Sequence, residues 1–268
     1  MIISLIIVSN SYAIQSTIVD VEGSSCSGED KSRKQTEQMA LDDAKRNAIE
    51  YVVTYIKSET KVKDFEIKSD IVKSYSQASV KVIEIKEKAW NKTELGDCYQ
   101  MKIKAEVIPS VTTSKKFIKK ASSGMDSNLP LSVQIWAKKK EFKYNEKIKI
   151  YIKGNKSFYG RILYTDTKGE TIQILPNPYR TDNYFTGGII YEIPNINDKF
   201  ELKISDPYGE DQIIIYSSTS PLGDIKMKKV GGVYLVTEKE VDIKTRDVNN
   251  SETSEFSEER ITIKTSDK

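Results

Sequence analysis

The sequence predicts an α+β protein, in which a small helix-on-sheet domain (strand, helix, strand, strand) precedes an antiparallel β-sandwich domain. Two observations lead to this fold class. Between residues 32 and 56 apolar side chains recur at helical spacing, and segments of alternating apolar and polar residues flank them. From residue 131 to residue 222, short alternating segments follow one another with turn residues between them and no helical pattern. A chain of 268 residues is long enough for two such cores.

These patterns divide the chain into five parts. The parts are a signal peptide at 1–13, the α+β domain at 14–108, a linker at 109–130, the sandwich at 131–222, and C-terminal strands with a mobile tail at 223–268. The linker is rich in Ser, Thr and Lys and is bounded by prolines. In the last part we expect two final strands around a mobile loop, added at the edge of the sandwich. These strands are KEVDIKTRDV at residues 239–248 and EERITIKTSD at residues 258–267.

The first domain opens with a predicted strand at residues 17–24. The helix that follows begins near Ser32, because Ser32 and Gln35 fit a capping box. Small side chains line one side of this helix, which lets it pack closely against a sheet. They are Ala40, Ala44 and Ala48.

Residues 79–90 and 98–108 predict two further strands. The first changes phase between Val82 and Ile83, which indicates a β-bulge. The second alternates without interruption. Its inward residues are Tyr99, Met101, Ile103, Ala105 and Val107, and its outward residues are Gln100, Lys102, Lys104 and Glu106.

The chain has two cysteines, Cys26 and Cys98, and both belong to the first domain. If the first and last strands of that domain are antiparallel, the two residues reach the same edge of the sheet. We expect a disulfide, as is usual in exported proteins, with two unrelated thiols as the alternative. We expect no metal site, because two thiolates without histidine leave the coordination shell half empty.

The N-terminus predicts export. An apolar run from Met1 to Val8 precedes Ser11 and Ala13, whose small side chains suit cleavage by signal peptidase after Ala13. The mature chain then begins at Ile14 and resides in the periplasm or is secreted. A buried first strand is the alternative. No later segment approaches the ~18 apolar residues of a membrane span.

Composition argues against most catalytic classes. The chain has no histidine, which excludes Ser-His-Asp and Cys-His catalysis and histidine zinc sites. Its formal net charge of +3 is evenly distributed, so we expect no nucleic-acid partner. We therefore expect that the protein is not an enzyme and that it has no catalytic residues and no cofactor. The rival hypothesis, a hydrolase that uses the carboxylates of Asp206 and Glu210, rests on residue type alone.

One segment, ILPNPYRTDNYFTGG at residues 174–188, is a candidate binding loop. Its simplest interpretation is a connection between two sandwich strands. Its functional interpretation is a patch that contacts a ligand or partner, since aromatic residues and arginine on loops suit recognition. The residues of that patch are Tyr179, Arg180, Tyr184 and Phe185.

Two resemblances follow from longer stretches of sequence. The pieces FKYNEKIKIYIKGN, FYGRILYTDTKGETIQILPN, GGIIYEIP and FELKISDPYGEDQIIIYSSTSPL, within residues 142–222, resemble the bacterial domain of unknown function 4384. Asn145-Glu146 replaces that family's Gly-Asp turn, and TRDV at 245–248 is similar to its trailing Thr-Arg element. Residues 17–108 look like the small envelope domain of flagellar assembly protein T (amino-terminal part) and the lipoprotein-20 family. VDVEG, ALDDAKRNAIEYVVTYI and CYQMKIKAEV carry this second resemblance.

Neither resemblance implies a catalytic motif. Both imply a non-enzymatic interaction or assembly module of the bacterial cell envelope, whose partner is an envelope protein or a cell-wall glycan. The alternative is a carbohydrate- or peptidoglycan-binding module that uses aromatic residues of the sandwich loops, because nine of the fifteen tyrosines lie between residues 130 and 222.

Overall fold

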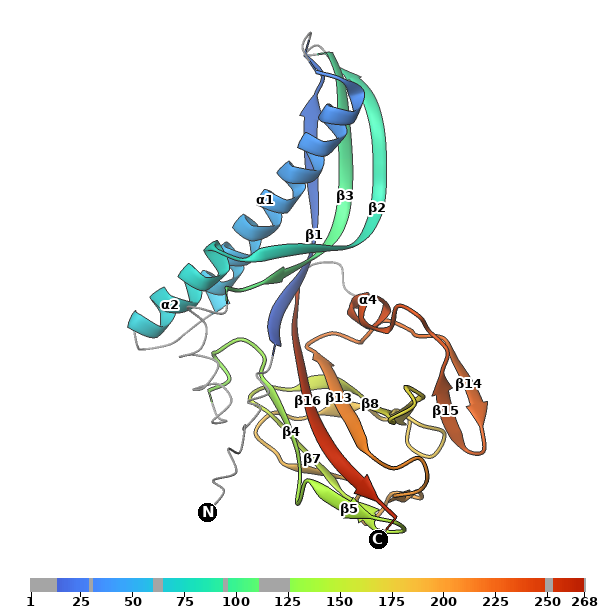
Figure 1. Cartoon of the computed structure of the whole chain (residues 1–268). Helices are drawn as coiled ribbons and strands as arrows, with labels where there is room; N and C mark the ends of the chain where they lie inside the picture. Colours follow the sequence, from blue (N-terminus) through green and yellow to red (C-terminus); the bar gives the residue numbers. More distant parts are fainter. Residues whose placement is uncertain are drawn as a thin grey trace, which may run out of the picture.

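The computed structural model describes residues 14–28, 31–59, 65–93, 96–110, 126–248 and 253–267 (Figure 1). The predicted signal peptide, at residues 1–13, and most of the predicted linker lie outside these ranges. The described chain forms two lobes built mostly from antiparallel strands. We call the part made of β1–β3, α1 and α2 the helical lobe, and the part made of β4–β16 and α4 the sandwich lobe.

The helical lobe has three long strands and two helices. They are β1 (Ile14–Cys26), α1 (Arg33–Glu59), α2 (Phe65–Ser76), β2 (Ser79–Thr93) and β3 (Gly96–Ile108). The predicted capping box is confirmed, since the Gln35 backbone N–H donates to Ser32 Oγ and the Ser32 N–H donates to Gln35 Oε1, at 3.3 and 2.8 Å. The predicted bulge is also confirmed, since the β2–β3 register shifts between Val82 and Glu84.

The core of the helical lobe lies between α1 and the sheet. Ala40, Ala44 and Ala48 are buried, as are the predicted inward residues of β3. The close approach also needs Gly23 on β1, where an added Cβ would lie 2.3 Å from the Ala44 backbone nitrogen. At the far end of β1, Cys26 lies opposite Cys98 on β3, and the two are joined by a disulfide. The expected disulfide is therefore present.

The sandwich lobe consists of many short strands. They are β4 (Val133–Ala137), β5 (Glu141–Lys143), β6 (Lys147–Ile148), β7 (Ile150–Gly154), β8 (Phe158–Thr165), β9 (Thr171–Leu175), β10 (Tyr184–Phe185), β11 (Tyr191–Ile193), β12 (Leu202–Lys203), β13 (Glu210–Ser218), β14 (Met227–Val230), β15 (Val233–Val236) and β16 (Thr253–Ser266), with α4 (Val241–Arg246) before β16. A small sheet, β11-β7-β4, packs against the large one. Between them lies an isoleucine-rich core that includes Ile150, Ile162, Ile213 and Ile263.

One large sheet joins the two lobes. Its strand order in the described chain is β14-β15-β9-β8-β13-β16-β1-β3-β2, with β10 beside β8 and β5 parallel to β16. β16 pairs with β13 on one side and with residues Ile14–Val19 of β1 on the other, so it is a central strand (Figure 1). The expectation that the last strands would add to the sandwich edge therefore fails for β16.

Two further expectations differ from the structure. Residues 241–246 form a short helix, α4, where the sequence pattern indicates a strand. Lys104 and Glu106, expected on a solvent face of β3, are buried, because α4 and the residues after it cover that face. None of the described helices is long and apolar enough to cross a membrane.

Candidate functional site

The predicted binding loop is anchored by Asn177. Its side-chain Oδ1 accepts the backbone N–H groups of Tyr179 and Arg180, at 2.8 and 2.9 Å. Its Nδ2 donates to the carbonyl of Ile174 at 2.7 Å. Because Asn177 is buried, these bonds hold the turn after β9 in one conformation.

Arg180 braces the same loop from the other side. Its guanidinium pairs with Asp198 at 3.1 Å and lies over the ring of Phe185, 5.6 Å from its centroid. The side chains of Arg180 and Asp198 are only 14% and 7% exposed, so the two charges interact mainly with each other and little with solvent. Arg180 thus positions the loop and presents little of its charge to solvent.

Phe185 belongs to the sandwich core and does not join a surface patch. It is 1% exposed, and its ring lies 5.2 Å from that of Phe158 and 5.0 Å from that of Tyr191. The loop contains a two-residue strand, β10, and neighbouring side chains of a strand point to opposite faces. Tyr184 therefore points outward and Phe185 inward.

Tyr179 and Tyr184 are the exposed members of the predicted set, at 54% and 48%. The hydroxyl of Tyr179 lies against the β14–β15 turn, where a Cβ added to Gly232 would be 2.6 Å from Tyr179 Oη. Val230 and Val233 flank this turn and are also exposed. We call Tyr179, Val230 and Val233 the hairpin patch.

Tyr184 lies beside a second tyrosine. Its ring centroid is 5.0 Å from that of Tyr159, which lies opposite it on β8. The loop therefore exposes two aromatic rings, each resting on a neighbouring element. The structure does not bring the four predicted residues together as one surface.

The carboxylates of the rival hydrolase hypothesis are exposed surface groups. Asp206 is paired with Lys168 at 3.8 Å and Glu210 with Lys264 at 3.9 Å. Their side chains are 78% and 70% exposed, so water screens both carboxylates and neither has the burial that tunes a catalytic acid. In the described ranges, no group of three or more Asp, Glu or Cys residues is arranged to hold a metal ion.

An open hollow of about 790 Å³ lies against β1, β2, β3 and α1. Two of the polar groups that line it complete the edge of β1. The Asp43 carboxylate accepts the Ser24 N–H at 3.0 Å, and Asn47 Nδ2 donates to the Glu22 carbonyl at 2.9 Å. These side chains satisfy backbone groups of β1 beyond its last residue paired with β16, so they have a structural role.

Sequence reasoning missed a buried charge cluster at the boundary between the lobes. Arg246 Nε pairs with Glu106 on β3 at 2.9 Å, and Arg246 Nη2 pairs with Glu258 on β16 at 2.5 Å. All three side chains are at least nine-tenths buried. Burial alone would lower the pKa of Arg246, but the charges of Glu106 and Glu258 outweigh it and raise the pKa above its ordinary value. The motif TRDV, which contains Arg246, was the available signal.

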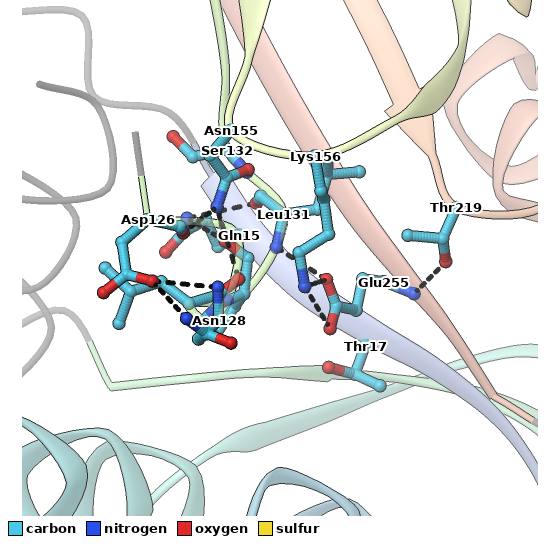
Figure 2. Close-up of polar contacts among 12 residues, drawn as sticks. Gln15, Thr17, Asp126, Asn128, Leu131, Ser132, Asn155, Lys156, Thr219 and Glu255 are labelled. Carbon is cyan, nitrogen blue, oxygen red and sulfur yellow. Dashed lines mark hydrogen bonds and ion pairs between the residues drawn. The ribbon is translucent and has the colours of Figure 1, made fainter. Parts of the chain in front are cut away.

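A second polar cluster lies on the face of β16 opposite Glu258, where it binds the first residues of the sandwich (Figure 2). Glu255 accepts the Leu131 N–H at 2.7 Å and pairs with Lys156 at 2.9 Å. Gln15 Nε2 donates to the Leu131 carbonyl at 3.1 Å, and Asn155 Oδ1 accepts the Ser132 N–H at 2.8 Å. Both faces of β16 are therefore tied to neighbouring elements by buried polar groups.

Residues 141–221 match the family model of a domain of unknown function (DUF4384). The resemblance of the sandwich to that family is thereby confirmed for these residues. The matched segment begins at β5 and ends just after β13, so it contains the binding loop but neither α4 nor β16. No curated protein and no solved structure matches the chain. The resemblance of residues 17–108 to the envelope domain stays a prediction.

Proposed function

We propose that this protein is an exported, non-enzymatic interaction or assembly module of the bacterial cell envelope, and that it contacts its partner through the hairpin patch. The observation that carries this proposal is the rigid presentation of Tyr179. Its ring is exposed, yet its loop is held by Asn177 and by the Arg180–Asp198 pair. A pre-ordered aromatic side chain loses little conformational entropy on binding, which is typical of residues that dominate interfaces.

Two features support export. The disulfide between Cys26 and Cys98 is typical of proteins that fold in an oxidising compartment. The apolar run and small residues of positions 1–13 have the pattern of a signal peptide. We expect the intact mass of the native protein to correspond to a chain that begins at Ile14 and lacks the two thiol hydrogens. A retained Met1, or quantitative labelling of both thiols, would contradict export.

The proposed binding surface is tested by replacing Tyr179. We expect the wild-type chain to capture a specific envelope component after crosslinking, and Tyr179→Ala to reduce that capture by about tenfold or more. Tyr144→Ala is the matched control, since Tyr144 is 61% exposed but lies in the β5–β6 turn. Equal capture by the Tyr179 variant and the wild type would refute the hairpin patch as the contact surface.

A glycan-binding module is the second candidate. The exposed ring of Tyr184 beside Tyr159 favours it, because paired aromatic rings offer a platform on which a sugar can stack. Sedimentation with purified peptidoglycan separates the two candidates. Under the glycan hypothesis the wild type sediments with the polymer and Tyr184→Ala does not. Under the hypothesis of a protein partner neither chain sediments.

A further inference from the structure

Residues 241–248, which comprise α4 with Asp247 and Val248, lie across the strands of the large sheet. We call this segment the strap. Its side chains contact four strands from both lobes. In the order of the strands, the pairs are Thr245–Arg161 on β8, Asp242–Tyr216 on β13, Arg246–Glu258 on β16, and Arg246–Glu106 and Asp247–Lys104 on β3.

The sheet register explains how one short segment reaches so many strands. Arg161, Tyr216 and Glu258 lie directly opposite one another on β8, β13 and β16. β1 follows β16 in the sheet, and its Ser16 hydroxyl donates to Glu106 of β3 at 2.6 Å. The strap therefore covers a row of residues that runs across the sheet from β8 in the sandwich lobe to β3 in the helical lobe.

The lobe boundary under the strap is charged where it could have been apolar. Arg246, Glu106 and Glu258 are 6%, 1% and 3% exposed at their side chains. The attraction within such a buried group is largely offset by the loss of hydration, so apolar residues of similar volume stabilise a fold as well or better. Charged pairs add geometric specificity to the boundary, since a guanidinium between two carboxylates forms its hydrogen bonds in few relative orientations.

We propose that the strap fixes the angle between the helical and sandwich lobes and contributes little to the stability of either. Arg246 is its positioning residue. It joins a carboxylate of β3 to a carboxylate of β16, and its guanidinium lies 4.8 Å from the ring centroid of Phe256. Without these pairs, the lobes bend about β1, the strand that pairs with both β16 and β3.

The decisive variant replaces all three buried charges at once, as Arg246→Met, Glu106→Leu and Glu258→Leu. Neither carboxylate of this cluster then remains buried without its cation, so we expect the protein to fold with a cooperative thermal transition. The readout is the distribution of distances between spin labels at Tyr51 on α1 and Ile196 after β11, both exposed. Attachment through unnatural amino acids leaves the disulfide intact. We expect one narrow distribution for the wild type and a distribution at least about twice as wide for the triple variant.

Arg260→Gln is the matched control. Arg260 pairs with the same Glu258, but its side chain is 49% exposed and lies outside the strap, so we expect an unchanged distribution. Lys104→Met with Asp247→Asn is the second test, because it removes the last pair of the strap while the Arg246 pairs remain. A narrow, wild-type distribution in the triple variant overturns the proposal. If the triple variant does not fold, the width of the distance distribution in the second variant decides. A wider distribution than that of the wild type then supports the proposal, and an unchanged width overturns it. Failure of both variants to fold also overturns it.

Discussion

Gly23 sets the distance between α1 and β1. A Cβ at this position would lie 2.3 Å from the backbone nitrogen of Ala44 and 2.4 Å from the carbonyl oxygen of Ala40. Backbone atoms cannot rotate away, so Gly23→Ala must displace the helix. We expect the free energy of unfolding to fall by about 1–3 kcal/mol, measured by urea denaturation. Gly28→Ala is the control, because a Cβ there meets nothing within 4 Å. Equal stabilities of the two variants would contradict this account.

Glu259 on β16 predicts a pH dependence. Burial, with the neighbouring charge of Glu258, raises the pKa of Glu259 to about 7, even though Arg260 acts in the opposite direction. In the unfolded chain this carboxyl ionises near pH 4.3, so the folded state binds the extra proton between about pH 4.3 and 7. Stability from this group is therefore lost as pH rises through that window.

Glu259→Gln isolates that effect, since glutamine does not titrate. We expect the stability of the variant relative to the wild type to increase between pH 5 and pH 8, as measured by the urea midpoint. Glu210→Gln provides the comparison, because it makes the same replacement on β13 at a side chain that is 70% exposed. A difference that stays constant with pH would show that Glu259 is already ionised in the folded protein at pH 5.

At the scale of elements, the β14–β15 hairpin supports the hairpin patch. Gly232 has a φ of +88°, and a Cβ there would lie 2.6 Å from Tyr179 Oη. We expect Gly232→Ala to shift the ring resonances of Tyr179 in NMR spectra and to weaken partner capture, while the fold persists. Gly231→Ala is its control, since a Cβ at Gly231 meets nothing within 4 Å. Unchanged Tyr179 resonances in the Gly232 variant would contradict the contact.

Local patterns predicted β3 well and its surroundings poorly. Alternation identified the strand and its inward face, because Ile103 and Val107 need a partner surface. The same alternation placed Glu106 in solvent, because periodicity does not record what covers the second face of a sheet. Arg246 supplies the missing information, since its charge makes burial of Glu106 tolerable. That pairing joins distant positions and is invisible in a single sequence.

β16 shows the same limit for a whole element. The sequence indicates a strand there through Ile261 and Ile263, which face the sandwich core. It gives no sign that Ser257 and Glu258 lie between two neighbouring strands. Strand order depends on pairing between distant segments, whereas turn residues and periodicity report only local structure. The same holds for the binding loop. The sequence identified its aromatic residues, but the pairing of the short strand β10 determines that Tyr184 is exposed and Phe185 is buried.

At the scale of the whole molecule, the two lobes share one sheet. β1 of the helical lobe pairs with β16 of the sandwich lobe over six residues, Ile14–Val19, and both faces of β16 carry polar ties to other elements. The sequence favours independent folding of residues 17–108 and 131–222, because the segment between them lacks periodic apolar positions. Neither part contains β16, so the large sheet would lack a central strand in both. We infer that the lobes depend on each other for completion.

A specific protease site inserted between residues 115 and 120 tests this dependence. We expect the cleaved protein to elute as one species in size-exclusion chromatography, because pairing between β1 and β16 and the two polar clusters survive the cut. The same sample in urea should separate into two fragments, which confirms complete cleavage. Two separate peaks under native conditions would show that the shared sheet does not hold the lobes together.

The central position of β16 in the sheet also determines when the sheet can form during synthesis of the nascent chain. Ile14 ends up opposite Glu258, so β1 has no neighbour on that side until residues 253–258 have been made. At synthesis rates of about 5–20 residues per second, this interval lasts on the order of ten seconds or more. Closure of the sheet is therefore a late event. An export route that threads unfolded polypeptides would meet a chain whose central strand is still missing.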